Sequence, residues 1–257
     1  MIGWMLRERL HDIHSRIEQT ARRVGRNPAD IQLVAVTKNV PIGTIREAIS
    51  LGVRHIGENK MQEALFKYKQ LERWKELRPS TFDLPPLQWH LIGHLQTNKV
   101  RDAVQIFDWI HSVDSLRLAE KINHEAEKIK KVMAVLIEVN TSGESAKYGV
   151  SPKEIHELIT DIKSLSSLHV EGLMTMAPIV SDPNQARPYF QQLARLRQEI
   201  LDQCLVMPTS PPAPQPPSAL ALFHLSMGMS QDFEAAIEEG ATMVRIGSAI
   251  FYRTRFK

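Results

Sequence analysis

Short apolar runs that alternate with helical segments constrain the fold of this chain more than any other feature. Eight such runs are candidate strands: Ile31–Val36, Val53–Ile56, Leu87–Ile92, Trp109–Val113, Val132–Val139, His169–Met174, Leu222–Ser226 and Thr242–Ile246. The first run is apolar almost throughout, as expected of a strand that is buried on both faces. Strict alternation of strands with helices predicts a parallel sheet that is covered by helices.

The segments between these runs have helical patterns. Seven helices are predicted within them: Pro41–Leu51, Lys60–Leu77, Thr97–Phe107, Ser115–Lys130, Pro152–Leu165, Asn184–Cys204 and Ser230–Glu239. A further helix is expected over residues 1–26, as part of the fold and not as a leader. One apolar stripe at helical spacing defines it: Leu6, Leu10, Ile13, Ile17, Ala21 and Val24.

Eight strands, each but the last followed by a helix, fit a single α/β domain over residues 1–257. The predicted architecture is a (β/α)8 TIM barrel with the N-terminal helix as an addition. An open, doubly wound sheet is the alternative. The Gly-x-Gly-x-x-Gly pattern of dinucleotide-binding sheets does not follow the first strand, and its absence favours the barrel.

Composition argues against several classes of protein. No segment reaches the roughly 18 uninterrupted apolar residues of a membrane-spanning helix. The single cysteine, Cys204, excludes an internal disulfide and fits a reducing compartment such as the cytoplasm. Lys and Arg number 32 against 29 Asp and Glu, and this small excess is dispersed. We therefore expect no nucleic-acid partner, and a small anionic ligand fits the charge balance better.

Residues 205–222 interrupt the alternation of strands and helices. Six of the 15 prolines lie between Pro208 and Pro217. Proline lacks an N–H group and fixes φ, so this segment is predicted to be neither helix nor central strand. We expect a solvated loop insert on the barrel face away from the functional site. A ligand for a proline-binding domain is the alternative.

Lys38 lies two residues beyond the first candidate strand. Barrels carry their chemistry at the C-terminal ends of the strands. Lys38 is therefore expected at the barrel mouth, partly desolvated, where its amine could form a Schiff base with a carbonyl compound. The alternative is a lysine that merely caps the strand.

The last two candidate strands end in residues that suit an anion. Ser226-Met227-Gly228-Met229-Ser230 follows the seventh strand, and Arg245-Ile246-Gly247-Ser248 follows the eighth. Glycine lets the backbone approach an oxyanion, and Ser230 is predicted to cap the next helix. Barrels commonly bind phosphate at these two loops. Ordinary glycine turns are the alternative reading. A reactive lysine facing a phosphate site suggests pyridoxal 5′-phosphate (PLP) or a phosphosugar.

Nine motifs, in order, resemble the pyridoxal phosphate homeostasis protein family, whose members look like the alanine racemase barrel standing alone. They extend from about Leu33 to Phe251: Val34-Ala35-Val36-Thr37-Lys38, Ile56-Gly57-Glu58-Asn59, Trp89-His90-Leu91-Ile92-Gly93-His94-Leu95-Gln96, His111-Ser112-Val113-Asp114, Asn140-Thr141-Ser142, Lys147-Tyr148-Gly149, Gly172-Leu173-Met174, Ser226-Met227-Gly228-Met229-Ser230-Gln231-Asp232 and Val244-Arg245-Ile246-Gly247-Ser248.

This resemblance implies that Lys38 holds PLP as a covalent Schiff base. The implied cofactor-binding residues are Lys38, Asn59, His90, Ser226, Met227, Arg245, Gly247 and Ser248. Those after the last two strands would hold the phosphate, Met227 through its backbone, while Asn59 and His90 would line the pocket. Arg245 would face the pyridine nitrogen. Because a guanidinium stays protonated, that nitrogen would stay unprotonated and the ring would be a poorer electron sink.

The resemblance implies a cytoplasmic, monomeric protein of vitamin B6 homeostasis and amino-acid balance, with apo PLP-dependent enzymes as recipients of its cofactor. No robust enzyme activity is expected, and no catalytic residue is assigned. Alanine racemase takes a second base, a tyrosine, from a further domain. This sequence ends at Lys257, and none of its tyrosines is an obvious replacement: Tyr68, Tyr148, Tyr189 and Tyr252.

Two alternative functions remain open, and several polar residues are assigned no site. A weak PLP-dependent racemase or lyase that uses Lys38 as its base is the main alternative. A class I aldolase acting on a phosphosugar is a poorer one. No metal site is expected, because His90 and His94 do not share a helical face. Glu58 and Asp114 are expected only to bond backbone amides at strand ends.

Overall fold

The computed structural model describes residues 2–76, 86–144, 146–205 and 220–252. Within these residues, eight parallel strands close into a barrel in the order β1 to β8. The strands are β1 Gln32–Val36, β2 His55–Glu58, β3 Gln88–Leu91, β4 Trp109–Val113, β5 Met133–Glu138, β6 Leu168–Met174, β7 Leu220–Ser226 and β8 Met243–Ile246. The closed barrel confirms the predicted fold and excludes the open sheet.

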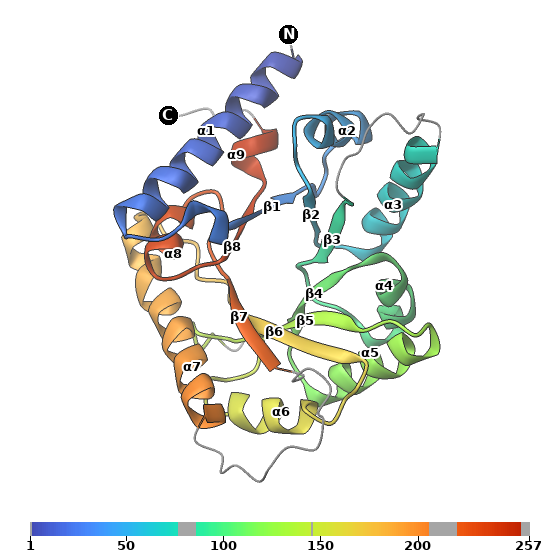
Figure 1. Cartoon of the computed structure of the whole chain (residues 1–257), viewed down its shortest axis with the longest axis vertical. Coiled ribbons are helices and arrows are strands. Elements are labelled where there is room, and N and C mark those ends of the chain that lie inside the picture. Colours follow the sequence, from blue (N-terminus) through green and yellow to red (C-terminus); the bar gives the residue numbers. More distant parts are fainter. Residues whose placement is uncertain (1, 77–85, 145, 206–219, 253–257) are drawn as a thin grey trace.

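The helices lie outside the ring of strands (Figure 1). They are α1 Ile2–Arg23, α2 Ile42–Ser50, α3 Met61–Glu76, α4 Val100–Ile106, α5 Leu116–Lys128, α6 Ile155–Ile162, α7 Arg187–Leu205, α8 Phe233–Glu238 and α9 Ser248–Phe251. The short α9 was not predicted from the sequence. None of the helices in the described ranges is long and apolar enough to cross a membrane.

The additional helix α1 packs against α8 and α9, on the side where β1 pairs with β8 and closes the barrel (Figure 1). Its predicted stripe is buried from Leu6 to Ala21, but Val24 is exposed because the helix ends at Arg23. Gly25, at φ 70°, then reverses the chain. The Arg16 guanidinium donates two hydrogen bonds of 3.0 Å to Glu234 of α8, so α1 is fixed to the barrel by charge as well as by apolar contact.

Many predicted boundaries are wrong by one to three residues; α6, for instance, spans Ile155–Ile162 and not Pro152–Leu165. The second strand begins at His55 and not at Val53, because the Val53 N–H donates to Ala48 O and closes the end of α2. The predicted insert over 205–222 is too long, since Leu205 belongs to α7 and β7 begins at Leu220. The prolines between these two elements lie outside the described residues.

The strands carry different side chains on their two faces. Outward-facing residues form one continuous apolar core with the helices. Inside the barrel, Leu136, Met174 and Met243 form only a small apolar cluster, against which Trp109 packs. The rest of the interior is largely polar, and this polar interior leads to the C-terminal ends of the strands.

Candidate functional site

Lys38 lies at the C-terminal end of the barrel, in a turn directly after β1. Its side chain is exposed, so the expected partial desolvation is wrong for this structure. The reason is local: Val40 N–H donates to Thr37 O at 2.9 Å, and this turn lifts Lys38 to the rim. Its backbone is nevertheless held, because the Tyr252 hydroxyl donates to Lys38 O at 2.9 Å.

A buried ion-pair network fixes the two residues that flank Lys38. Lys67 of α3 donates to Thr37 O at 2.6 Å, to Glu58 Oε1 at 2.7 Å and to Glu63 Oε1 at 2.6 Å. The Thr37 hydroxyl also donates to Glu58, and the Asn39 N–H donates to Glu63 at 2.6 Å. Both neighbours of Lys38 are thereby tied to α3.

This network was missed in the sequence. Glu58 was expected to bond a backbone amide, but it pairs with Lys67 instead, and burial raises its pKa against the opposing effect of Lys67. The only local signal was the spacing of Glu63 and Lys67, one helical turn apart. Their contact with Glu58 depends on how α3 packs on β2.

Asn59 follows β2 and carries an unpartnered polar atom. Its Oδ1 is buried and has no hydrogen-bond partner. The backbone of the β3 loop presses close here, since a Cβ on Gly93 would lie 2.3 Å from Asn59 O. Buried polar atoms are rarely left unpaired. The side chain of Asn59 is therefore available to a bound group at the mouth.

Arg245 and Ser226 form a buried pair from β8 and β7. The guanidinium donates to Ser226 Oγ at 2.6 Å and to Thr175 O at 2.9 Å. Burial lowers the pKa of Arg245 to about 10, and Arg245 therefore remains a cation at neutral pH. Arg245 thus gives the barrel interior a positive charge, and its hydrogen bonds to Ser226 and Thr175 fix the position of the guanidinium.

Glu138, at the end of β5, was also missed. Only 7% of it is exposed. Burial and then the charge of Asp114 raise its pKa to about 7, while Arg245 acts in the opposite direction. At the end of an apolar run such a glutamate is typical of a solvated strand end, so no sequence pattern singles it out.

His90 is fully buried in the barrel interior, not at its rim. Its Nδ1 lies 2.9 Å from His111 Nε2, and its Nε2 lies 3.1 Å from His55 Nδ1. His111 Nδ1 in turn lies 3.0 Å from Ser226 Oγ. Burial holds the pKa values of His90 and His111 well below the ordinary range. His90 therefore reaches the site through His111 and Ser226.

The loop after β7 approaches α8 very closely. Gly228 has φ 89°, and a Cβ there would lie 2.5 Å from the Cβ of Ala236, so no other residue fits. The Met227 N–H already donates to Met243 O at 3.1 Å, which leaves its expected role with the phosphate without a free donor in this structure.

Ser230 is not the predicted helix cap. The N-cap of α8 is Asp232, whose Oδ1 accepts from Met229 N–H at 2.6 Å. Ser230 Oγ accepts instead from Ala249 N–H at 3.3 Å and joins the two loops that were expected to bind phosphate.

Gly247 and Ser248 lie where β8 runs into α9. Ser248 is exposed, and Gly247 is partly exposed beside β1. A Cβ on Gly247 would lie 3.0 Å from Val36 O. The structure thus brings the end of β8 against the strand that leads to Lys38, as the barrel prediction required.

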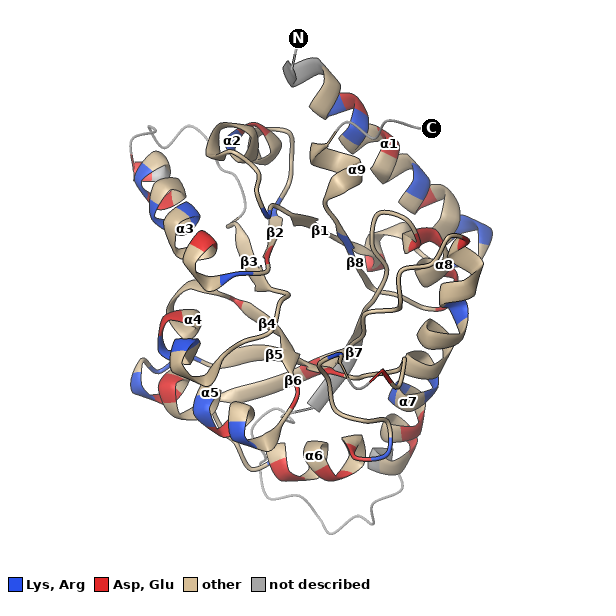
Figure 2. Ribbon diagram, turned by 180° about the vertical axis from the view of Figure 1, so that it is seen from behind, with Lys and Arg blue, Asp and Glu red and all other residues tan. Residues whose placement is uncertain are grey.

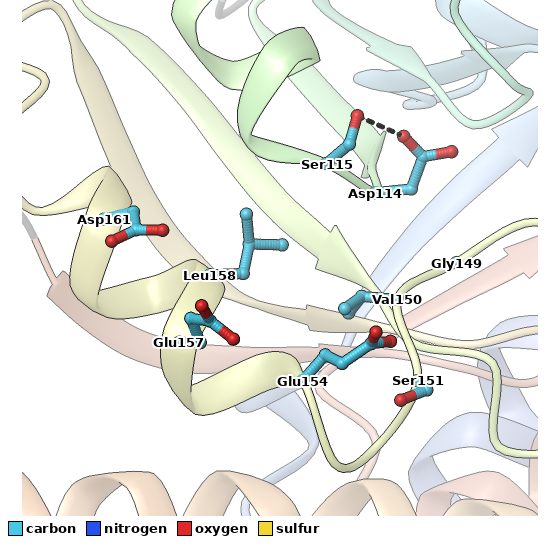
Figure 3. Close-up of a pocket in the computed structure, with 9 residues that line it drawn as sticks. All are labelled: Asp114, Ser115, Gly149, Val150, Ser151, Glu154, Glu157, Leu158 and Asp161. Carbon is cyan, nitrogen blue, oxygen red and sulfur yellow. Dashed lines mark hydrogen bonds between the residues drawn. The ribbon is translucent and has the colours of Figure 1, made fainter.

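A separate pocket of about 330 Å³ lies beside α6 and differs in charge (Figure 3). Its lining includes four carboxylates: Asp114, Glu154, Glu157 and Asp161. Asp114 accepts from the Ser115 hydroxyl at 3.2 Å and does not bond the backbone amide expected for it. These carboxylates would repel a phosphate, so this pocket is distinct from the site around Lys38. Among the described residues, no three ligand-type side chains gather closely enough to hold a metal ion.

Comparisons with known proteins bear on the family and the fold of this chain. The alanine racemase N-terminal domain family matches residues 9–254. The pyridoxal phosphate homeostasis protein of Aquifex aeolicus (strain VF5) is 41% identical over 249 residues, covering 97% of this chain and 98% of that protein. The structure of PipY of Synechococcus elongatus PCC7942 with PLP bound is 34% identical, with a TM-score of 0.77, covering 96% of this chain and 99% of PipY.

Alanine racemase of Clostridium difficile 630 shares the fold alone, at 17% identity and a TM-score of 0.64; the match covers 98% of this chain and 57% of that one. Near-complete coverage at well over 30% identity, together with the barrel fold, settles the relationship. The chain belongs to the pyridoxal phosphate homeostasis protein family, within the larger family of the alanine racemase N-terminal domain.

Proposed function

We propose that this protein binds PLP covalently through Lys38 and holds it as part of cellular PLP homeostasis. One observation carries the proposal: an exposed amine lies on a backbone clamped by Lys67 and Tyr252, at the end of the barrel where a buried arginine supplies positive charge. A PLP-bound relative with 34% identity over nearly the whole chain supports the same cofactor. PLP supplies an aldehyde and an electron-withdrawing ring when it is bound.

The residues of this chain fit PLP at several points. The unpartnered Asn59 amide would bond a polar substituent of the ring, and Arg245 would face the ring nitrogen. Gly247 and Ser248 would hold the phosphate, and Gly228 would let the preceding loop come close to it.

The hydrogen bonds that Ser226 and Met227 already make limit how each would bind the cofactor. Ser226 would offer its single hydroxyl proton to the phosphate while it still accepts from Arg245. Met227 would contribute by the course of its backbone, since its N–H is bonded to Met243. His90 would act indirectly, through its hydrogen bond to His111.

We further propose that the protein stores or hands over PLP without robust turnover. Arg245 would keep the ring nitrogen unprotonated, which restrains carbanion chemistry. Tyr252 is hydrogen-bonded to the turn that carries Lys38. Its hydroxyl donates to the Lys38 carbonyl and is therefore already engaged. Residues 1–257 would act as one cofactor-binding domain, monomeric and cytoplasmic.

Transfer of the cofactor is tested with purified, PLP-loaded protein and apo PLP-dependent enzymes as recipients. We expect the recipients to regain activity faster than with an equal concentration of free PLP. The loaded Tyr252→Phe variant serves as a comparison, because loss of its bond to Lys38 O would loosen the turn. Equal rates with free PLP would contradict the delivery role and leave the binding role standing.

A weak amino-acid racemase or lyase is the second candidate, and Glu138 favours it. A carboxyl with a pKa of about 7 in the barrel mouth could exchange a proton at neutral pH. A chiral assay over a panel of amino acids would detect turnover that disappears in Lys38→Ala and falls in Glu138→Gln. Turnover equal to that of free PLP would contradict this second function.

A further inference from the structure

Three histidines form an unbroken hydrogen-bonded chain across the barrel interior. His55 of β2 contacts His90 of β3 at 3.1 Å, His90 contacts His111 of β4 at 2.9 Å, and His111 contacts Ser226 at 3.0 Å. The chain begins at Arg245, which donates to Ser226 at 2.6 Å. Adjacent rings cross nearly edge to face, with centroids 5.1 to 5.2 Å apart, so the nitrogens of neighbouring rings meet.

The far end of this chain opens into a different pocket. His55 and Gln32 lie at the N-terminal ends of β2 and β1, and Gln32 Nε2 lies 2.7 Å from both ring nitrogens of His55. Both line a pocket of about 510 Å³ together with His224 and Thr242. The chain thus connects the C-terminal end of the barrel, where Lys38 lies, with a pocket at the opposite end.

Hydrogen-bond bookkeeping leaves this chain two self-consistent states, and the Gln32 amide matches each by its orientation. Its NH2 donates to His55 where Nε2 is unprotonated, and its oxygen accepts where His55 carries Nε2–H. Arg245 can only donate, so Ser226 Oγ must accept from it. If Ser226 gives its one proton to His111 Nδ1, then His111, His90 and His55 all carry their protons on Nε2. If Ser226 gives its proton to another group, His111 must donate to Ser226, and all three histidines carry their protons on Nδ1.

We propose that His55, His90 and His111 are a proton relay whose direction is set by what Ser226 binds. This inference rests on the proposed binding of PLP, because the phosphate is the group that would take the Ser226 hydrogen bond. When the phosphate binds, all three tautomers reverse. The state of the cofactor site is thereby transmitted to the pocket beside His55.

The proton balance of the reversal is closed. A phosphate monoester monoanion, whose second pKa is about 6, gives a proton to Ser226 Oγ as it becomes the dianion. Ser226 passes its own proton to His111 Nδ1, His111 passes its Nε2 proton to His90 Nδ1, and His90 does the same to His55. His55 releases its Nε2 proton to water in the pocket. One O–H or N–H bond forms and one breaks at each step.

The surroundings keep the relay neutral. Burial lowers the pKa values of His55, His90 and His111, so protons move by exchange of tautomers and not by resting on one ring. The titratable and charged groups that act on the relay or on its neighbours are His224 of β7, Arg245 of β8, Glu171 of β6 and Asp108 ahead of β4. His224 lines the same pocket but bonds Thr242 at 3.2 Å, outside the chain of three.

Nitrogen NMR of the histidine rings tests this directly. In the cofactor-free protein with ¹⁵N-labelled histidine, long-range proton–nitrogen spectra should show one shared tautomer, Nε2–H, for His55, His90 and His111. Addition of PLP should convert them together to Nδ1–H, whereas pyridoxal, which lacks the phosphate, should not. The His55→Gln variant should lose the PLP-dependent tautomer change at the pocket end of the relay. The matched control His224→Gln should keep the tautomer change of all three relay histidines.

Two results would overturn the relay: opposite tautomers on neighbouring histidines in the cofactor-free protein, or bound PLP that leaves the tautomers unchanged. A visible absorbance band of bound PLP, recorded on the same samples, separates the second result from failure of the proposed function. Absence of that band would overturn PLP binding and its signal to the relay together, while the cofactor-free spectrum still decides whether the three tautomers are coupled.

Discussion

The outer and inner faces of the barrel strands are built on different principles. Ile110 and His111 are neighbours on β4 and are both completely buried, yet Ile110 packs into the apolar layer under the helices and His111 bonds His90 and Ser226. Figure 2 shows Lys, Arg, Asp and Glu mainly on the outer helices, with few on the strands. The outer layer stabilises the barrel, whereas the interior buries polar groups, most of which are hydrogen-bonded to one another.

This difference predicts that the two faces can be damaged separately. Phe190 of α7 is 1% exposed in the outer layer, so Phe190→Ala should lower the free energy of unfolding by about 3–5 kcal/mol. PLP affinity of the folded fraction should stay within about twofold, well under the tenfold change that corresponds to 1.4 kcal/mol. Urea unfolding and absorbance titration measure the two quantities. A parallel loss of affinity would mean that the faces are not independent.

The ion pair of Glu58 and Lys67 is an exception, a charge buried on the helix side. Lys67→Met would leave Glu58 buried without its partner and should cost about 3–5 kcal/mol of unfolding free energy. The double variant Glu58→Gln/Lys67→Met should recover most of that loss. If the double variant is as unstable as the single one, the pair does not act through buried charge.

Glu138 should make stability depend on pH. Its pKa is raised from 4.5 to about 7, so the fold prefers the neutral carboxyl. This contribution is fully present below pH 4.5 and is lost as the pH rises through 7; a shift of this size corresponds to about 3 kcal/mol. Glu138→Gln, which stays neutral, should match the wild type at pH 4 and exceed it in unfolding free energy at pH 8.5. Parallel pH profiles would contradict the assignment.

The smallest effect is expected at the proline-rich insert. The C-terminal end of α7 and the N-terminal end of β7 flank it, and both lie at the end of the barrel opposite Lys38. Deletion of residues 207–217 should therefore leave PLP affinity unchanged in an absorbance titration. A collapse of affinity would show that this end of the barrel supports the site more directly than proposed.

Most of the fold follows from local sequence patterns. The alternation of apolar runs and helical segments is sufficient for the barrel, because each unit depends on its own periodicity and on the right-handed crossover between parallel strands. Apart from the short α9, the errors lie at boundaries such as Val53, where a helix end takes up a residue that is apolar enough for a strand.

The site is predicted less completely, since its contacts join distant parts of the chain. Lys38, Arg245 and Gly247 follow from their places at strand ends. Lys67 and His55 do not, because partners of each come from other elements: packing of α3 on β2 brings Lys67 to Thr37, and pairing of β2 with β3 brings His55 to His90. No local pattern distinguishes such a buried polar residue from a solvated one.

The most direct test of the account is the visible spectrum of PLP-treated protein, followed by borohydride reduction and peptide mass mapping. We predict a yellow protein whose reduced pyridoxyl group is on Lys38. The band should be lost in Lys38→Ala and kept in Lys60→Ala, another exposed lysine at the same end of the barrel. A colourless protein, or a label spread over surface lysines with Lys38 unmodified, would contradict the central claim.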